Sequence, residues 1–139
     1  FLKTVLENGL QLKPWPRTEQ RIADAVAAAG LAAAGWERLR AVVLLLGPGA
    51  RNGGDLTSDE AVPFLVALRV PLFVWSIGKS RSSEPWAAAT AIRTAADFDV
   101  AVARLRAELR RQRILWVEGA HLPQAVTLTP RAKGVRLAR

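Results

Sequence analysis

The chain has 139 residues, half of them apolar, which suits one domain with a real core and excludes a disordered chain. No run reaches the roughly 18–20 apolar residues of a membrane span, and the lack of cysteine excludes disulfides and thiolate metal sites. The net charge of +8 indicates either an acidic partner or simply a solvated basic surface.

The first residues, 1–16, predict an N-terminal extension or an edge strand. Leu10–Lys13 alternates apolar and polar residues, as an exposed strand does, and the prolines on either side of Trp15 then break regular structure. The chain begins with Phe1 rather than Met and shows no signal-peptide pattern. We therefore expect a processed chain or a segment of a longer one.

A helix is predicted next, over Thr18–Ala34. Thr18 suits the N-cap, the alanines favour a helix, and Gly35 with Trp36 ends it. The expected apolar stripe consists of Ile22, Ala25, Val26 and Ala29.

Two apolar runs, Ala41–Leu46 and Pro71–Ile77, carry the clearest fold signal. Neither alternates with polar residues, so each predicts a parallel strand that is covered on both faces. Binding sites in open α/β sheets lie at the loops that leave the carboxyl ends of the strands. The expected site loops are therefore residues 47–58 and 78–86.

A second helix is predicted between the two strands. Thr57 and Glu60 match a capping box. Its expected buried side consists of Val62, Leu65, Val66 and Leu68. After the second strand, Trp86–Ala91 suits a short helical turn.

The clearest helix is Asp97–Gln112, with Asp97 and Asp99 as expected capping carboxylates. Its apolar stripe consists of Phe98, Val102, Leu105 and Leu109. Ile114–Val117 is predicted as a third buried strand, with Trp116 inside it. The alternation of helices and strands predicts an α/β fold with a wound, mainly parallel sheet flanked by helices. Residues 123–139 are expected to form a basic C-terminal tail or hairpin.

The segment Arg40–Gly47, the Ser58-Asp59-Glu60 that follows a polar loop, and Val70–Gly78 resemble the later half of a von Willebrand factor type A domain, especially in bacterial relatives. The helix around Gln20–Ala29 is similar to a helix of that family. The resemblance implies a Rossmann-like α/β domain over residues 17–122, incomplete at its N-terminal side. It also favours a bacterial protein of an extracytoplasmic or membrane-associated assembly.

The resemblance further implies a metal-ion-dependent adhesion site that binds Mg²⁺ through an Asp-x-Ser-x-Ser motif, a threonine and a later aspartate. The chain contains no Asp-x-Ser-x-Ser, and no carboxylate stands where the later aspartate is expected. Thr18 and Asp55 are the nearest candidates, and both are weak. We therefore expect no cofactor and a lost metal site, unless the missing motif lies outside this chain.

These features predict a non-enzymatic protein–protein interaction or scaffold domain, a structural subunit whose partner is another protein or the rest of its own polypeptide. Exposed Trp beside Pro or Arg is a common anchor at such interfaces. The candidate partner-binding residues are Trp15, Trp36, Arg51, Asn52, Asp55, Arg81 and Trp86.

Two alternatives stay open. An arginine cluster on the last helix and its exit predicts binding of nucleic acid or an anionic surface, unless it is only a solvated helix face. Its members are Arg104, Arg106, Arg110, Arg111 and Arg113. The other alternative is a wound α/β hydrolytic enzyme that uses Ser76, Glu118 and His121, where His121 is the only histidine.

Overall fold

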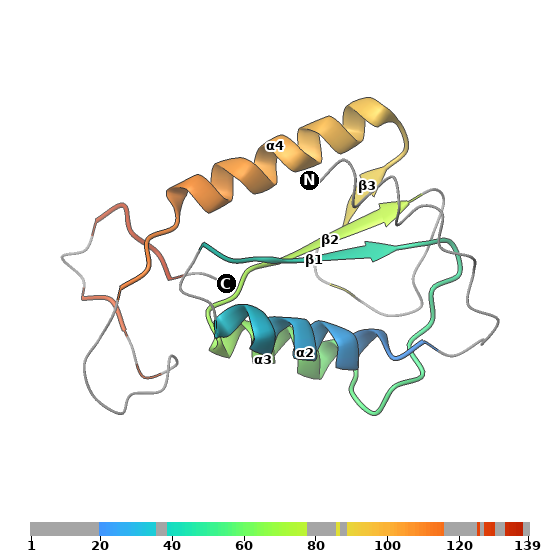
Figure 1. The fold of residues 1–139 in the computed structure, drawn as a ribbon, viewed down its shortest axis with the longest axis horizontal. Coiled ribbons are helices and arrows are strands. Elements are labelled where there is room, and N and C mark those ends of the chain that lie inside the picture. Colours follow the sequence, from blue (N-terminus) through green and yellow to red (C-terminus); the bar gives the residue numbers. More distant parts are fainter. Residues whose placement is uncertain are drawn as a thin grey trace.

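The computed structural model describes residues 20–35, 39–77, 86, 89–115, 125, 127–129 and 133–137. In this part of the chain a parallel sheet lies between two helices on one face and a third helix on the other (Figure 1). The predicted α/β class with a parallel sheet is therefore confirmed. The elements are α2 (Ile22–Ala34), β1 (Val42–Leu46), α3 (Ser58–Ala67), β2 (Leu72–Ile77), β3 (Thr90–Ile92) and α4 (Ala95–Arg111).

The sheet has three strands in the order β1-β2-β3, and both pairs are parallel. Both predicted apolar runs form strands, with Val42 level with Leu72. The third strand is β3, so the helical turn predicted over Trp86–Ala91 is wrong at its end. Ile114 and Leu115 lie outside any strand, and the rest of the strand predicted there lies outside the described residues.

Helix α2 begins later than predicted, because Gln20 and Arg21 precede it and Arg21 makes no side-chain cap bond. Thr18, the predicted cap, lies outside the described residues. The predicted stripe is wrong at Ala25 and Ala29, which are exposed. The buried residues are Ala23, Val26, Ala27 and Gly30, and this small-residue face lies against α3.

Helix α3 starts at the predicted capping box. The N–H and the hydroxyl of Thr57 both donate to Glu60 Oε2, each over 2.9 Å, and the pKa of Glu60 is lowered by these bonds. The helix ends with the N–H of Val70 donating to the carbonyl of Leu65 while Arg69 has a φ of 58°. That left-handed ending usually takes glycine.

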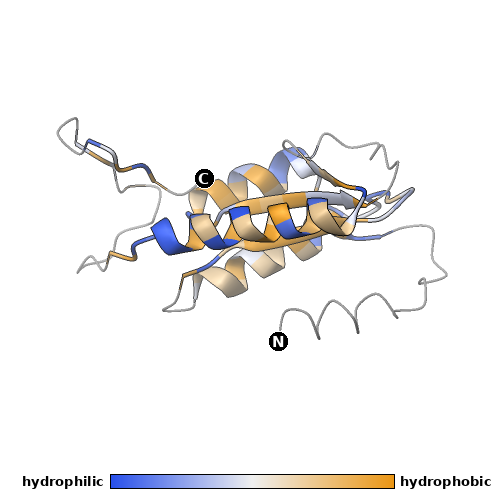
Figure 2. Cartoon of the chain, turned by 90° about the horizontal axis from the view of Figure 1, so that it is seen from above, coloured by the Kyte–Doolittle hydropathy of each residue, from blue (hydrophilic) through white to orange (hydrophobic). Residues whose placement is uncertain are grey.

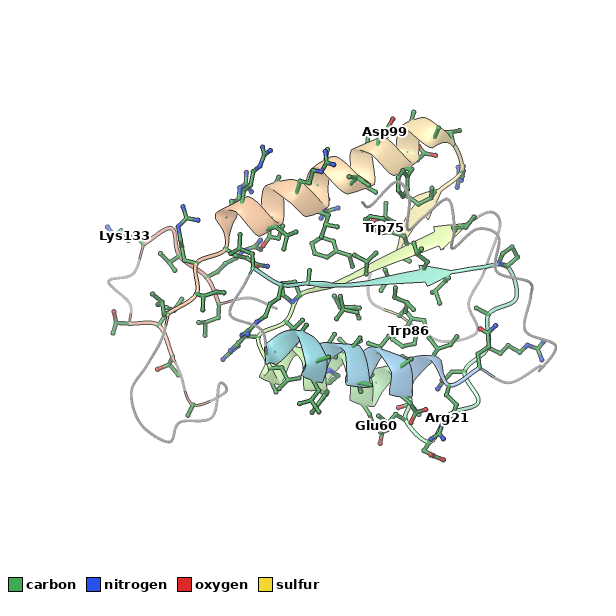
Figure 3. The ribbon with its side chains drawn as sticks, in the orientation of Figure 1. Arg21, Glu60, Trp75, Trp86, Asp99 and Lys133 are labelled. Carbon is green, nitrogen blue, oxygen red and sulfur yellow. The ribbon has the colours of Figure 1, made fainter. Side chains whose placement is uncertain are left out.

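Helix α4 starts at Thr94, whose hydroxyl accepts from the N–H of Asp97 over 3.2 Å. The Asp97 carboxylate accepts in return from the N–H groups of Arg93 and Thr94, and these bonds lower the pKa of Asp97. The predicted cap role is therefore confirmed for Asp97. It is wrong for Asp99, which is exposed and lies beyond the cap (Figure 3).

Two apolar clusters lie on opposite faces of the sheet. Trp75 packs on α4 with Ala101 and Leu105, and its ring meets that of Phe98 edge to face at 5.7 Å between centroids. The other cluster joins β1, β2, α2 and α3, and the side chain of Trp86 is buried in it (Figure 3). Most strand residues are apolar, whereas α4 alternates between apolar and polar residues (Figure 2).

Coverage of the sheet is less complete than predicted. Val42 and Leu46 are buried beneath the helix pair, but Val43 and Leu45 are 37% and 43% exposed on the α4 side. The reason is that β1 is an edge strand and α4 crosses the sheet over β2 and β3. The expectation that β1 is covered on both faces is therefore wrong.

The described parts of the C-terminal tail contain no strand, so they show no hairpin. Arg136 Nη2 contacts Glu108 of α4 over 3.1 Å and ties the tail to that helix. A hollow beside the turn after α3 is lined by Arg69, Leu128, Val135, Arg136 and Leu137.

Among the described residues, no helix has both the length and the apolar character that crossing a bilayer requires.

Candidate functional site at the carboxyl edge of the sheet

The candidate site is formed by the loop that leaves β1 and by the start of α2. The N–H of Gly53 donates to the carbonyl of Gln20 over 2.9 Å, and the N–H of Gln20 donates to Arg51 over 3.4 Å. Gln20 and Asn52 thereby form an isolated parallel bridge. The predicted site loop 47–58 is therefore joined to residues more than thirty positions earlier in the chain.

Asn52 holds this junction together through both ends of its side-chain amide. Its Oδ1 accepts from the N–H of Ala23 over 3.1 Å, and its Nδ2 donates to the carbonyl of Leu56 over 2.6 Å. The N–H groups in the first turn of a helix lack partners within the helix, and the side chain of Arg21, the residue before α2, caps none of them. The first bond therefore gives the N–H of Ala23 an acceptor. We predicted Asn52 as a partner contact, but its partly buried amide is committed to the fold.

Arg21 bridges two carboxylates at this edge. Its guanidinium contacts Asp24 through Nε and Nη2, both over 3.4 Å, and also forms an ion pair with Asp55. The pKa of Arg21 is raised chiefly by the hydrogen bond and the charge of Asp24, and then by the charge of Asp55. The side chain of Asp55 is 86% exposed, so solvent screens this cluster and its contribution to stability is small.

Gly54 allows the loop to approach α2 closely. A Cβ at this position would lie 1.7 Å from Asp24 Oδ2 and 3.3 Å from the Cα of Arg21. Any other residue would push the carboxylate of Asp24 away from its present place. The glycine is therefore required for the geometry of the ion cluster, beyond the turn-forming role of a glycine-rich loop.

The described residues of this edge do not fit a magnesium site. Of the two weak candidates, Asp55 is already engaged by the guanidinium of Arg21, and Thr18 lies outside the described residues. The described residues contain no group of three acidic, histidine or cysteine side chains that would hold a metal ion. A guanidinium provides the positive charge between Asp24 and Asp55.

Of the other predicted partner contacts, the structure describes Arg51 and Trp86. Arg51 is exposed at the edge, and its role as a partner contact stays a prediction. Trp86 is only 7% exposed and belongs to the core, so the prediction of a surface contact is wrong there. Trp15, Trp36 and Arg81 lie outside the described residues.

The arginine cluster is exposed throughout, but its members do not form one face. Arg104 and Arg111 are seven residues apart and share one side of α4, whereas Arg106 and Arg110 share another. None of the four side chains forms an ion pair within the described part of the chain. Of the alternative hydrolytic set, the structure describes only Ser76, which is half-buried near the end of β2, and Glu118 and His121 lie outside the described residues.

Sequence reasoning missed the roles of Arg21, Asp24 and Gly54. The spacing of Arg21 and Asp24 was a usable signal, because residues three apart lie together at the start of a helix. Nothing in the sequence links either residue to Asp55.

Comparison of the chain with protein-family models, with curated proteins and with solved structures finds no match.

Proposed function

We propose that this chain is a protein–protein interaction domain, similar in architecture to a von Willebrand type A domain, in which Arg21 takes the place of a metal ion. The observation that carries the proposal is the bridge from Arg21 to Asp24 and Asp55 at the carboxyl edge of the sheet. Partner binding through this edge would then need no divalent cation.

A protein suits this edge better than a small molecule. Ligand sites for small molecules are concave and largely apolar, whereas this loop presents the exposed polar side chains of Arg51 and Asp55. A partner with its own charged and polar rim would complement that surface. The role of the domain would be to join subunits of an assembly rather than to convert a substrate.

The test is a pull-down from the source organism with the chain as bait, in buffers with Mg²⁺ and with a chelator. We expect the same partner in both buffers. Arg51→Glu is expected to abolish capture, because it reverses an exposed charge at the edge without touching the core.

Arg106→Glu is the matched control, since it makes the same charge change on α4, away from the edge. Capture that requires Mg²⁺, or that survives Arg51→Glu unchanged, contradicts the proposal. If Arg106→Glu abolishes capture and Arg51→Glu does not, the partner binds through α4 instead of the edge.

A second candidate function is supported by the arginines of α4, which are exposed and form no ion pair with any other described side chain. Their four guanidiniums are available to phosphate groups, and binding to duplex DNA would then weaken steeply as salt rises. Titration of labelled duplex DNA at several salt concentrations tests this, with Arg104→Glu and Arg110→Glu as variants from the two sides of the helix. A shallow salt dependence removes this candidate.

A further inference from the structure

The loop after β1 contains an Asn-Gly pair, Asn52-Gly53, at its contact with the residues before α2. Asparagine loses its side-chain amide most readily when glycine follows it, because glycine carries no side chain that hinders the next backbone nitrogen. The sequence contains one other such pair, Asn8-Gly9, which lies outside the described residues. Whether the pair at the edge reacts therefore depends on the hydrogen bonds that the fold gives it.

The reaction involves only these two residues and water. The backbone nitrogen of Gly53 gives up its proton and attacks Cγ of Asn52, which forms a new C–N bond and closes a succinimide ring. The bond from Cγ to Nδ2 breaks, and Nδ2 leaves with a proton as ammonia. Water then opens the ring at either of its two carbonyl carbons, and the product at position 52 is aspartate or isoaspartate.

The fold occupies both reacting groups. The N–H of Gly53 donates to the carbonyl of Gln20 over 2.9 Å, so this bond must break before a base can remove the proton. The side-chain amide of Asn52 is bonded at both ends, to the N–H of Ala23 and to the carbonyl of Leu56. A hydrogen-bonded amide proton is reached only when the structure opens locally. The same opening therefore limits deamidation of Asn52 and hydrogen exchange at Gly53.

We propose that Asn52 is a deamidation site that reacts when the loop separates from α2 and that the contact with Gln20 protects while the loop is in place. The contact is a bridge of two backbone hydrogen bonds, and Gly53 is exposed beside it. Opening such a surface bridge costs less free energy than separating β1 from β2. The site is thus reached without unfolding of the sheet, and this inference does not depend on the proposed function.

The product does not restore the junction. Aspartate at position 52 still accepts from the N–H of Ala23, but it places a negative oxygen against the carbonyl of Leu56, to which Nδ2 donates over 2.6 Å. Isoaspartate adds a carbon to the main chain between Arg51 and Gly53, so these residues no longer match the two backbone groups of Gln20. An opening that ends in deamidation is therefore irreversible.

The first test compares the folded and the unfolded chain. The full chain is incubated at mildly alkaline pH with and without urea. The peptide that contains position 52 is followed by mass spectrometry, with chromatography to separate isoaspartate from aspartate. We expect deamidation of Asn52 to be at least about tenfold slower in the folded chain than in urea. Asn8 is the internal reference in urea, where both Asn-Gly pairs are expected to react at similar rates.

The second test loosens the contact with Gly54→Ala. A Cβ at this position would collide with the carboxylate of Asp24 and lie 3.3 Å from the Cα of Arg21, so the loop must move away from α2. We expect faster deamidation and faster hydrogen exchange at Gly53 in the folded variant, with an unchanged rate in urea. Gly47→Ala is the matched control, because it makes the same change in the same loop, where a Cβ would meet nothing within 4 Å.

Three outcomes overturn the inference. The first is an equal rate of deamidation at Asn52 in the folded chain and in urea, which needs no variant. The second is an equal rate in Gly54→Ala and Gly47→Ala, with circular dichroism to show that both variants are folded. The third is an isolated isoaspartate product whose Gly53 amide stays as protected from hydrogen exchange as in the unmodified chain.

Discussion

Gly30 sets how closely α2 packs on α3. A Cβ at this position would lie 2.6 Å from Leu65 Cδ1 and 2.8 Å from Leu65 Cγ, and Leu65 is 1% exposed, so it has no room to withdraw. Replacing glycine by alanine within a helix normally gains about 1 kcal/mol, whereas overpacking a core costs about 1–3 kcal/mol. We expect Gly30→Ala to lower the free energy of unfolding by about 1 kcal/mol, the difference of these two effects.

The assay is urea unfolding followed by circular dichroism, in two backgrounds. Leu65→Ala alone is expected to cost about 2–5 kcal/mol, but it removes the atoms that a new methyl group would meet. Adding Gly30→Ala to Leu65→Ala should therefore raise stability by about 1 kcal/mol. Ala29→Gly, at an exposed position next to Gly30, is the control and should cost about 1 kcal/mol. A gain from Gly30→Ala in both backgrounds would refute the close contact.

Two further predictions concern the helix starts. Asn52→Leu is expected to lower the free energy of unfolding by about 1–3 kcal/mol, because the N–H of Ala23 loses its acceptor in a partly buried place; an unchanged urea midpoint would contradict this. Asp97→Asn is expected to destabilise the chain at neutral pH and much less in acid. The N–H groups of Arg93 and Thr94 lower the pKa of Asp97, so its stabilising effect is present above the pKa of the unfolded chain and is lost as pH falls through the folded pKa. The gap between the urea midpoints of variant and unmodified chain should stay constant from pH 7 to near the ordinary aspartate pKa of 3.8 and narrow below it. A gap that does not narrow in acid would count against the argument.

The parallel α/β class could be predicted because its signals are local. The apolar runs Ala41–Leu46 and Pro71–Ile77 are long enough to be recognised as buried strands. Thr57 and Glu60 form a capping box, which marks the start of α3. Strand β3 could not be predicted, because three residues do not establish a pattern and pairing with β2 fixes their conformation.

The candidate site was predictable in place but not in chemistry. The rule for parallel sheets located the loop after β1, and that loop does meet another element. The exposure of Val43 was not predictable, since an apolar strand reads the same at the centre of a sheet and at its edge. The role of Arg21 depends on Asp55, 34 positions away, and only the folded chain brings them together.

The close packing at Gly30 affects the ion cluster at the edge as well as the stability of the α2–α3 pair. Arg21 and Asp24 are carried by the first turn of α2 and the residue before it, whereas Asp55 lies in the loop that leads into α3. Any change in the separation of the two helices shifts one half of the ion cluster relative to the other. A methyl group inserted about 13 Å away along α2 is therefore expected to alter the surface chemistry of the edge, so that a change of volume inside the helix pair reaches the exposed charges of the ion cluster.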